Sequence, residues 1–391
     1  MIPEIKQLIR RGHEVLVVPR SPRGRIVHGH EIKRQSRAEG LCSRAVLTAA
    51  ASIGWSAPRK VGSAVLPLLK TRSLKLGIKN LAVVPKALWL AQIAKSWRAE
   101  HIHCHWAGTT ATMTMIASRL SGIPWSFTAH RWDIVENNLL AEKVQSAAFA
   151  RFISEDGLRM ARERGVRDAE NACVLRMGVS IPSHVQRWYG PRPLIVCPAR
   201  LVEVKGHRFL LEAWRILQRR GLDPELWLAG DGELRAQLEA LCESFGLGGA
   251  VRFLGSVPHR ELLNIYEQLP VFAVALPSID LGKGEHEGIP VALVEAMSYG
   301  IPVIATATGG TAELVTPGSG LLVRPADPEG LAGAVQRLIQ DPTLRTQLGD
   351  AGRRRAVEAH DIVRIVEELV MSFAATSVRA APAAEILTQS A

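Results

Sequence analysis

Two glutamates eight positions apart, Glu287 and Glu295, are the residues whose chemistry the rest of the chain must position. Pro290 suits the first turn of a helix and Gly300 is followed by a proline, so we predict a helix of about ten residues between them. Its side chains are apolar on every face, which is typical of a buried helix. A carboxylate on such a helix, Glu295, needs a hydrogen-bonding partner and could take it from a ligand hydroxyl.

The start of this helix is a natural anion site, because free amides near Gly288 and the positive dipole end point outward together. Two arbitrary glutamates would more often be a solvated loop acid and a satisfied core carboxylate. A glycosidase pair is the rival interpretation and needs a separation of roughly 5 to 9.5 Å. Eight helical residues span about 12 Å, which is longer than the glycosidase separation. The spacing therefore favours two acids that contact opposite ends of a nucleotide sugar.

Two cations, Arg200 and Lys205, straddle the predicted start of a helix over Arg208–Arg219. An arginine fork and a lysine point charge suit a diphosphate at such a place. Gly230 lies in a turn between a strand and a helix, and this turn lacks the third glycine of a dinucleotide fingerprint. By themselves, both features fit a plain loop as well as an anion site.

Histidines mark two further strand ends. His101, His103 and His105 alternate along a predicted strand and therefore share one of its faces. No acidic or cysteine cluster accompanies them, so we expect polar contacts at a ligand cleft and no metal. His130 ends the next predicted strand, where a lone histidine is more often structural than catalytic.

These residues must be positioned by strands and helices that alternate along the chain, a pattern typical of α/β folds with parallel sheets. Two prolines and a glycine between strand patterns predict a linker at residues 181–192. Residues 20–60 are interpreted as a mobile loop region with some helix. Strands are predicted at residues 14–19, 101–106, 123–128, 151–154, 171–175, 194–198, 225–229, 251–254, 271–276, 303–305 and 320–323.

The composition is that of a globular protein of 391 residues, with 47% hydrophobic and 22% charged residues, and two domains are expected. No apolar run reaches the roughly 18 residues of a membrane span, and the N-terminus lacks the apolar core of a signal peptide. We therefore expect a cytoplasmic protein. Five scattered cysteines without a CxxC pair indicate reduced thiols.

The net charge of +11 is concentrated in residues 1–100, which hold 19 Lys or Arg against 5 Asp or Glu. A basic half suggests an anionic partner. Without zinc spacing, an RNA-binding aromatic signature or a helix-turn-helix, nucleic acid is disfavoured. An anionic membrane surface, a lipid-linked phosphate acceptor and plain solvation remain. The basic, apolar helical pattern at residues 61–97 fits a membrane surface and a buried helix with lysines at its rim equally well.

Several segments resemble motifs of the retaining GT-B glycosyltransferases of family 4. Residues 287–295 match the E-x7-E signature and are followed by Gly300-Ile301-Pro302-Val303 and the turn Gly309–Glu313. Residues 128–133 match T-x-H-x-x-D, and residues 199–206 match G-R-L-x-x-x-K-G with alanine in place of the first glycine. The resemblance covers nearly the whole chain, but residues 4–18 look like the family's first helix and second strand, with no first strand before them.

This resemblance implies an α/β fold of the GT-B type, in which two Rossmann-like domains face each other across a cleft, here with the first strand of the N-terminal domain missing. Residues 1–185 would form an acceptor-binding domain and residues 186–360 a nucleotide-sugar-binding domain. A helix over residues 361–373 would pack back on the N-terminal domain. Residues 374–391 are expected to form a disordered tail.

The family's functional residues map onto this sequence by position. His130 would lie beside the donor sugar at the catalytic centre, Glu287 would contact that sugar, and Glu295 would hold the ribose. Arg200 and Lys205 would clamp the diphosphate. Further donor contacts are expected from Gly230, Gly288, Ile289 and Pro290, and acceptor contacts from His105, Arg131, Trp132 and Asp133.

The implied activity moves a sugar from a nucleotide-diphosphate donor to a hydroxyl of a saccharide or lipid-linked acceptor, with retention and without a metal or other cofactor. Exopolysaccharide or cell-surface glycan synthesis in bacteria is the expected setting, with peripheral membrane contact through the basic N-terminal domain at the inner face of the membrane. The alternatives are a nucleotide-sugar epimerase of the same fold and a truncated, inactive nucleotide-sugar-binding protein. A phosphorylase would need a pyridoxal lysine, and we identify none. The donor's base and sugar stay open.

Overall fold

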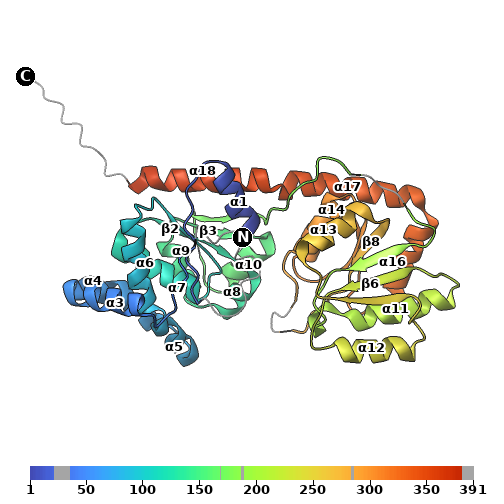
Figure 1. Ribbon diagram of the computed structural model, residues 1–391, viewed down its shortest axis with the longest axis horizontal. Helices are drawn as coiled ribbons and strands as arrows, with labels where there is room; N and C mark the ends of the chain where they lie inside the picture. The colour runs from blue at the N-terminus through green and yellow to red at the C-terminus, as the bar shows by residue number, and fades with distance from the viewer. Residues whose placement is uncertain (22–35, 168, 186–188, 283–285, 381–391) are drawn as a thin grey trace, which may run out of the picture. The chain divides into compact units, whose positions relative to one another are not determined.

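The computed structural model describes residues 1–21, 36–167, 169–185, 189–282 and 286–380, and the chain divides into two compact units (Figure 1). Unit 1 comprises Met1–Ile153, Gly157–Leu175 and the residues from Val366 onward. Unit 2 comprises Ser154–Asp156 and Arg176–Ile365. The division after Leu175 precedes the predicted linker, whose residues 186–188 lie outside the described residues.

Unit 1 contains a parallel sheet with the strand order β1-β2-β3-β4. All residues of β2 and β3 are buried, as expected for parallel strands covered on both faces. The strands are β1 (Ile102–His105), β2 (Trp125–Ala129), β3 (Phe149–Phe152) and β4 (Ala172–Val174). The helices that connect or follow them are α7 (Thr109–Ser121), α8 (Arg131–Glu136), α9 (Leu140–Ser146) and α10 (Glu155–Glu163).

The predicted strand at residues 14–19 is wrong. Only Val17 pairs, in an isolated bridge to Ser36, and the aliphatic side chains of residues 15–18 are half-buried. An apolar run becomes a strand only where a neighbouring strand offers its backbone groups. Among the described residues, β2 is the only strand that pairs with β1, so the helix α1 (Ile2–Arg10) is followed by an extended segment without a ladder.

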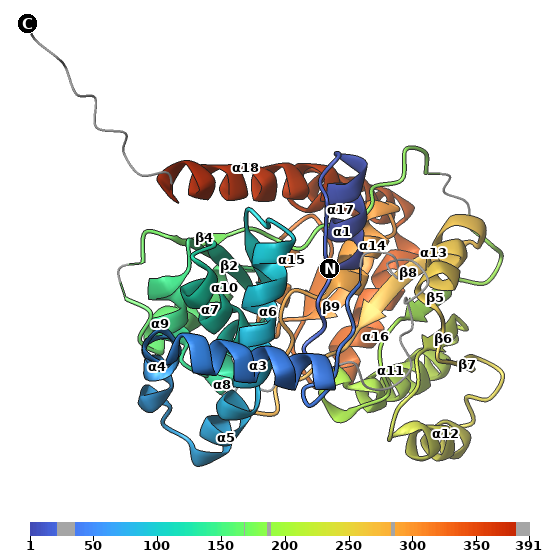
Figure 2. The same ribbon diagram turned by 60° about the vertical axis from the view of Figure 1, so that its left-hand side comes forward.

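Before the sheet, unit 1 has a group of helices that Figures 1 and 2 both show gathered at one end of the unit. They are α3 (Arg44–Ser56), α4 (Pro58–Val65), η2 (Leu66–Lys70), α5 (Leu74–Ala82) and α6 (Val84–Ser96). Pro58, Pro67 and Pro85 stand in first turns, where a missing N–H costs nothing. The helical prediction for residues 61–97 is confirmed. In the predicted loop region, α3 and the start of α4 are helical, and residues 22–35 lie outside the described residues.

Unit 2 contains a six-stranded parallel sheet with the order β10-β9-β8-β5-β6-β7, and the six strands predicted for it are confirmed. The strands are β5 (Leu194–Cys197), β6 (Glu225–Ala229), β7 (Val251–Gly255), β8 (Val271–Leu276), β9 (Val303–Thr306) and β10 (Leu321–Val323). The helices are η3 (Glu203–Lys205), α11 (His207–Arg219), α12 (Arg235–Ser244), α13 (His259–Gln268), α14 (Val291–Ser298), α15 (Thr311–Leu314), α16 (Pro328–Gln340) and α17 (Pro342–His360).

Helix α17 was not predicted from the sequence. Its N-cap, Asp341, accepts the N–H of Leu344 at 2.8 Å, and Pro342 occupies the first turn. The buried face is made largely of small residues such as Gly352 and Ala356, so it lacks the apolar periodicity of an ordinary amphipathic helix.

Helix α18 (Ile362–Ala380) closes the described chain and runs past the predicted end at Phe373 into the predicted tail; residues 381–391 of that tail lie outside the described residues. From Val366 the helix belongs to unit 1, where the ring of Phe373 lies 4.7 Å from that of His101. Among the residues that the structure describes, no helix has both the length and the hydropathy of a membrane span.

Candidate functional site

The candidate donor residues of unit 2 follow four adjacent strands of its sheet. The strands β9, β8, β5 and β6 are neighbours in that order. Because the carboxyl ends of parallel strands meet at one edge, their loops form a single rim, the usual place for ligands in such sheets. The loops carry Arg200 and Lys205 after β5, Gly230 after β6, Glu287 to Pro290 after β8, and Gly309 with Gly310 after β9.

Close backbone contacts hold these loops together. A Cβ at Gly230 would lie 2.0 Å from the carbonyl oxygen of Ala199, at the end of β5. Gly309 has a φ of +47°, and a Cβ there would lie 2.1 Å from the carbonyl oxygen of Glu287. Both positions therefore require glycine, because the loops could not approach so closely around a side chain.

Lys205 and Glu287, predicted on separate loops, meet in the structure. The Lys205 ammonium donates to Glu287 Oε1, and both side chains are largely buried. Arg200, the second predicted cation, is exposed. The rim thus presents a cation and a carboxylate side by side, beside the backbone that leads into α14.

Glu295 has a partner that sequence reasoning missed. His259 Nε2, at the start of α13, lies 2.7 Å from Glu295 Oε1, and the Glu295 side chain is 13% exposed against 50% for His259. The predicted need of this carboxylate for a hydrogen bond is confirmed. Its partner His259 directly follows Pro258, and no sequence pattern there distinguishes it as a functional residue. Helix α14 begins only at Val291, so Glu287 lies outside it and the helical estimate of the span between the two acids is wrong.

In unit 1, Asp133 explains the spacing of the T-x-H-x-x-D segment. Its Oδ2 accepts the backbone N–H of His130 at 2.9 Å, which caps the start of α8. The same carboxylate also accepts backbone N–H groups of Ala107 and Gly108, and burial raises its pKa. Asp133 therefore ties the loop after β1 to the loop after β2.

His130 stands between these loops with its Nε2 buried and without a hydrogen-bond partner among the described residues. Its ring centroid lies 5.9 Å from that of Trp106 and 6.3 Å from that of His105. Burial lowers the pKa of His130 to about 4, so the imidazole is neutral at pH 7 and can donate to or accept from a ligand hydroxyl. Next to it, the buried Arg131 guanidinium lies 5.7 Å from the exposed Trp132 ring.

Behind His105 lies a buried ion pair that the sequence did not reveal. Glu4 Oε1 lies 2.7 Å from an Arg151 nitrogen, and Glu4 Oε2 lies 3.2 Å from His105 Nε2. Burial alone would raise the pKa of Glu4, but the hydrogen bond from His105 and the charge of Arg151 hold that pKa well below its usual value. No local pattern marks Glu4, which lies in the first turn of α1.

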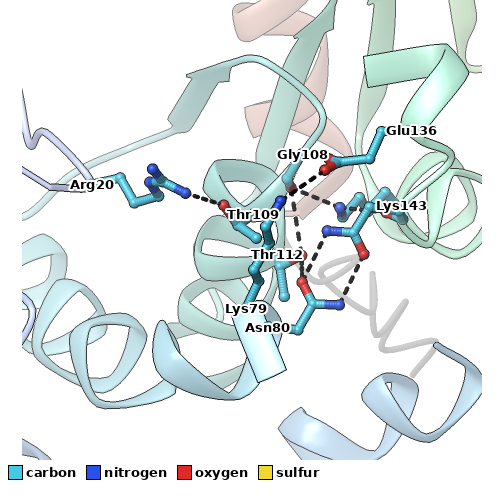
Figure 3. Close-up of polar contacts among 9 residues, drawn as sticks. Arg20, Lys79, Asn80, Gly108, Thr109, Thr112, Glu136 and Lys143 are labelled. Carbon is cyan, nitrogen blue, oxygen red and sulfur yellow. Dashed lines mark hydrogen bonds and ion pairs between the residues drawn. The ribbon is translucent and has the colours of Figure 1, made fainter. Parts of the chain in front are cut away.

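The loop after β1 is also held by Lys143 (Figure 3). This buried ammonium donates to the carbonyl oxygens of Ala107 at 2.7 Å, Gly108 at 2.8 Å and Asn138 at 2.5 Å. Burial lowers the pKa of Lys143 to about 7. With Asp133 holding the amides and Lys143 the carbonyls, the backbone beside His130 is fixed from both sides.

A cavity of about 1280 Å³ runs along β1 within unit 1. His105 and Asp133, both predicted on the acceptor side, contribute to its wall, as do Glu4 and Trp106. Apolar side chains, among them Leu90 and Phe373, line the remainder.

The match to a family model follows the division between the units. A family model described as Glycosyl transferases group 1 matches residues 183–355, which all lie in unit 2. The chain is 33% identical over 162 residues to a GDP-mannose-dependent monoacylated alpha-(1-6)-phosphatidylinositol monomannoside mannosyltransferase of Corynebacterium glutamicum, covering 41% of this chain and 42% of the relative. It is 37% identical over 186 residues to the putative colanic acid biosynthesis glycosyltransferase WcaL of Escherichia coli, covering 45% and 43%. The chain thus spans less than half the length of these relatives.

Solved structures match over more of the chain. A glycosyltransferase from Rickettsia africae aligns over 96% of this chain and 93% of its own, with a TM-score of 0.71 and 16% identity. Anabaena Alr3699/HepE in complex with UDP and glucose aligns over 95% of both chains, with a TM-score of 0.69 and 18% identity. At such identities the likeness shows the fold, which is the predicted GT-B type with two parallel-sheet units.

Proposed function

Through residues 183–355 the chain belongs to the glycosyl transferases group 1 family, and from this premise we propose that it moves a sugar from a nucleotide-diphosphate donor to an acceptor hydroxyl with retention of configuration. The observation that carries the proposal is the rim of unit 2, where the loop bearing Lys205 meets the loop bearing Glu287. A cation for a diphosphate and a carboxylate for sugar hydroxyls are there side by side.

In the proposed reaction the bond from the anomeric carbon to the diphosphate oxygen breaks as the bond to the acceptor oxygen forms, and the acceptor's proton passes to the diphosphate. Lys205, Arg200 and the amides around Gly288 would stabilise the charge that develops on the leaving group, an electrostatic effect worth several kcal/mol in such sites. We therefore expect activity without a divalent metal. No side chain is assigned as a nucleophile.

Glu287 would orient the donor sugar once the diphosphate has drawn Lys205 away from it. Glu295, held by His259, would accept from the ribose hydroxyls. Gly230, Ile289 and Pro290 would line the donor site through their backbone, as the close packing of these loops allows.

On the acceptor side we propose His130 as the group that contacts the reacting sugar, because its buried Nε2 has no partner among the described residues. The cavity beside His105 would receive the acceptor. Arg131 and Trp132 would contact the acceptor from the start of α8. For Asp133 we propose support of the His130 loop rather than direct contact, since its carboxylate is occupied by three backbone amides.

We also propose a role in bacterial exopolysaccharide or cell-surface glycan synthesis, on the cytoplasmic side of the membrane. Relatives with related roles in their names support it: an amylovoran biosynthesis glycosyltransferase of Erwinia amylovora and a lipopolysaccharide core biosynthesis glycosyltransferase of Rhizobium meliloti. The acceptor would then be a saccharide or a lipid-linked glycan.

The first experiment measures hydrolysis of UDP-, GDP- and ADP-sugars without acceptor, in EDTA, for wild type, Glu287→Ala and Glu261→Ala. Glu261 is an exposed acid on α13 of the same unit and serves as the control. Turnover of one donor that falls about 10³-fold in Glu287→Ala and is unchanged in the control would support a metal-independent transferase. NMR of the product's anomeric proton would report retention. Wild type that neither binds nor turns over any of these donors would overturn the proposal.

A further inference from the structure

A second surface of unit 1 lies outside the candidate site and combines two properties. The first is charge. Between Glu39 and Glu100 the sequence contains no acidic residue and ten Lys or Arg, and this stretch forms α3, α4, η2, α5 and α6. Arg44, Arg59, Lys60, Arg72 and Lys75 are exposed and make no ion pair within the described residues.

Two other cations of the stretch are paired with acids from elsewhere in unit 1. Lys70 lies 3.5 Å from Glu142, and Lys79 lies 3.4 Å from Glu136. Because these pairs neutralise only part of the charge, α3, α4 and α5 keep a strongly positive outer surface.

The second property is exposed apolar side chains. Trp55 is 92% exposed, Leu69 82% and Leu74 83%, and Leu66, Ile78 and Leu81 are exposed by more than half. A single exposed leucine needs no explanation, but a group of them on one set of contacting helices does. Trp55 lies in the last turn of α3, which contacts α4, and η2 contacts both α4 and α5, so these side chains belong to neighbouring elements.

Helix α5 shows that the exposure of these apolar side chains follows from how the helix is anchored. Leu74, Ile78 and Leu81 stand at the spacing i, i+4, i+7 and are all exposed, so they form one outward stripe. The residue that faces inward is polar: Asn80 exchanges side-chain hydrogen bonds with Asn138 at 2.8 and 2.9 Å and accepts one from Thr112 at 3.0 Å (Figure 3). The helix is thus anchored by an amide and presents its leucines to the outside.

We propose that α3, α4, η2 and α5 form a docking surface for an anionic lipid bilayer. Trp55, Leu69 and Leu74 enter the boundary between headgroups and acyl chains, and Arg59, Lys60 and Lys75 contact anionic headgroups. Proteins that bind the interface of an anionic membrane commonly combine tryptophan, exposed aliphatic side chains and an excess of Lys and Arg. A nucleic acid would use the cations but leave the leucines in water, and a second copy of this chain would bring the same positive charge against itself.

This proposal stands apart from the proposed function, because vesicle binding needs neither donor nor acceptor. If both hold, the surface would keep the enzyme where a lipid-linked acceptor resides.

The test is flotation of the full chain with vesicles of phosphatidylcholine, with and without about 30% phosphatidylglycerol. We expect binding to the anionic vesicles that weakens at high salt. Trp55→Ser/Leu69→Ser/Leu74→Ser should lower the partition coefficient about tenfold or more. The matched control, Leu254→Ser/Leu322→Ser/Met371→Ser, changes exposed apolar residues elsewhere and should bind as wild type does.

A second pair of variants tests the charge. Arg59→Gln/Lys60→Gln/Lys75→Gln should reduce binding to the anionic vesicles about tenfold, whereas Arg159→Gln/Arg208→Gln/Arg252→Gln removes as many exposed cations elsewhere and should change it little. Unfolding curves and donor hydrolysis that match wild type would establish that these variants are folded. Equal loss in test and control variants, no vesicle binding by wild type, binding of tRNA in place of vesicles, or concentration-dependent self-association in their place would each overturn the proposal.

Discussion

The described interior of unit 1 holds six charged side chains, Glu4, Lys86, Arg131, Asp133, Lys143 and Arg151, whereas that of unit 2 holds His207 and His360 and no Lys, Arg, Asp or Glu. Unit 2 has one apolar core that continues from Val179 to Ala356, and unit 1 has separate smaller clusters. Removal of charge from water is costly, so each buried charge of unit 1 must be matched by a partner from a distant segment.

The contrast coincides with the extent of the family match. The family match lies entirely in the unit with the apolar core. An apolar core tolerates exchange of one hydrophobic residue for another of similar volume, and its pattern persists. A buried ion pair tolerates no single exchange, so the unit that uses such pairs is defined by particular residues rather than by a general pattern.

The largest expected effect is on the buried ion pair. Arg151→Met leaves the Glu4 carboxylate buried without its cation and should lower the free energy of unfolding of unit 1 by about 3–5 kcal/mol, as measured by urea denaturation with hydrogen exchange to locate the loss. Arg252→Met, which breaks an exposed pair with Glu225 in unit 2, should cost about 0–1 kcal/mol. Glu4→Gln added to Arg151→Met should recover part of the stability. Equal losses in the two single variants would remove the distinction between the units.

A smaller effect is expected on donor binding, which we assign to unit 2. Lys205→Ala should weaken the binding of the nucleotide-diphosphate donor about 10- to 100-fold, because a charge-assisted contact to the diphosphate is lost. Calorimetry with the donor identified by the hydrolysis panel would measure it, with the exposed Arg208→Ala as the control. Unchanged affinity in Lys205→Ala would remove this residue from the donor site.

Acid should weaken unit 1 before unit 2. Burial lowers the pKa of His101 and His130 to about 4 and also lowers the pKa values of His103 and His105, whereas unfolded histidines titrate near pH 6.5. Between these values the unfolded chain binds more protons than the folded chain, so the stability present above pH 6.5 is lost as the pH falls toward 4.

Unit 2 has the same shift at two histidines, His207 and His360, whose pKa values are also lowered to about 4. Hydrogen exchange at pH 7, 6 and 5 should therefore show protection decreasing more steeply in β1 and β2 than in β5 and β8. An equal or steeper decrease in unit 2 would contradict the role given to the buried histidines of unit 1.

The smallest effect is expected from His259, which contacts Glu295 across one hydrogen bond and is half exposed. His259→Ala should raise the KM for the donor about threefold with little change in kcat, because Glu295 keeps its charge and loses only its orientation. His184→Ala, an exposed histidine of unit 2, is the control. A large loss of kcat would instead place His259 in contact with the reacting groups.

The sequence by itself determined most elements of unit 2. Its strands lie at the predicted positions because each is a short apolar run bounded by turn residues, and such local signals need no distant partner. Gly230 and Gly309 lie in turns that the sequence predicted. The structure gives the reason for glycine there, because a neighbouring backbone comes too close for a side chain. Sequence motifs also identified the loops of the candidate site, together with Lys205 and Glu287 on them.

The tertiary structure decided which side chains pair with each other. Glu4 meets Arg151, Lys205 meets Glu287 and Glu295 meets His259, and in each pair the two residues are far apart in the sequence and are brought together by the fold. The fold also decided two outcomes that apolar residues alone did not predict. Residues 14–19 form no strand, and the apolar side chains Leu74, Ile78 and Leu81 of α5 are exposed. Local patterns specify helices and strands, whereas burial and partnership depend on which segments the fold brings alongside.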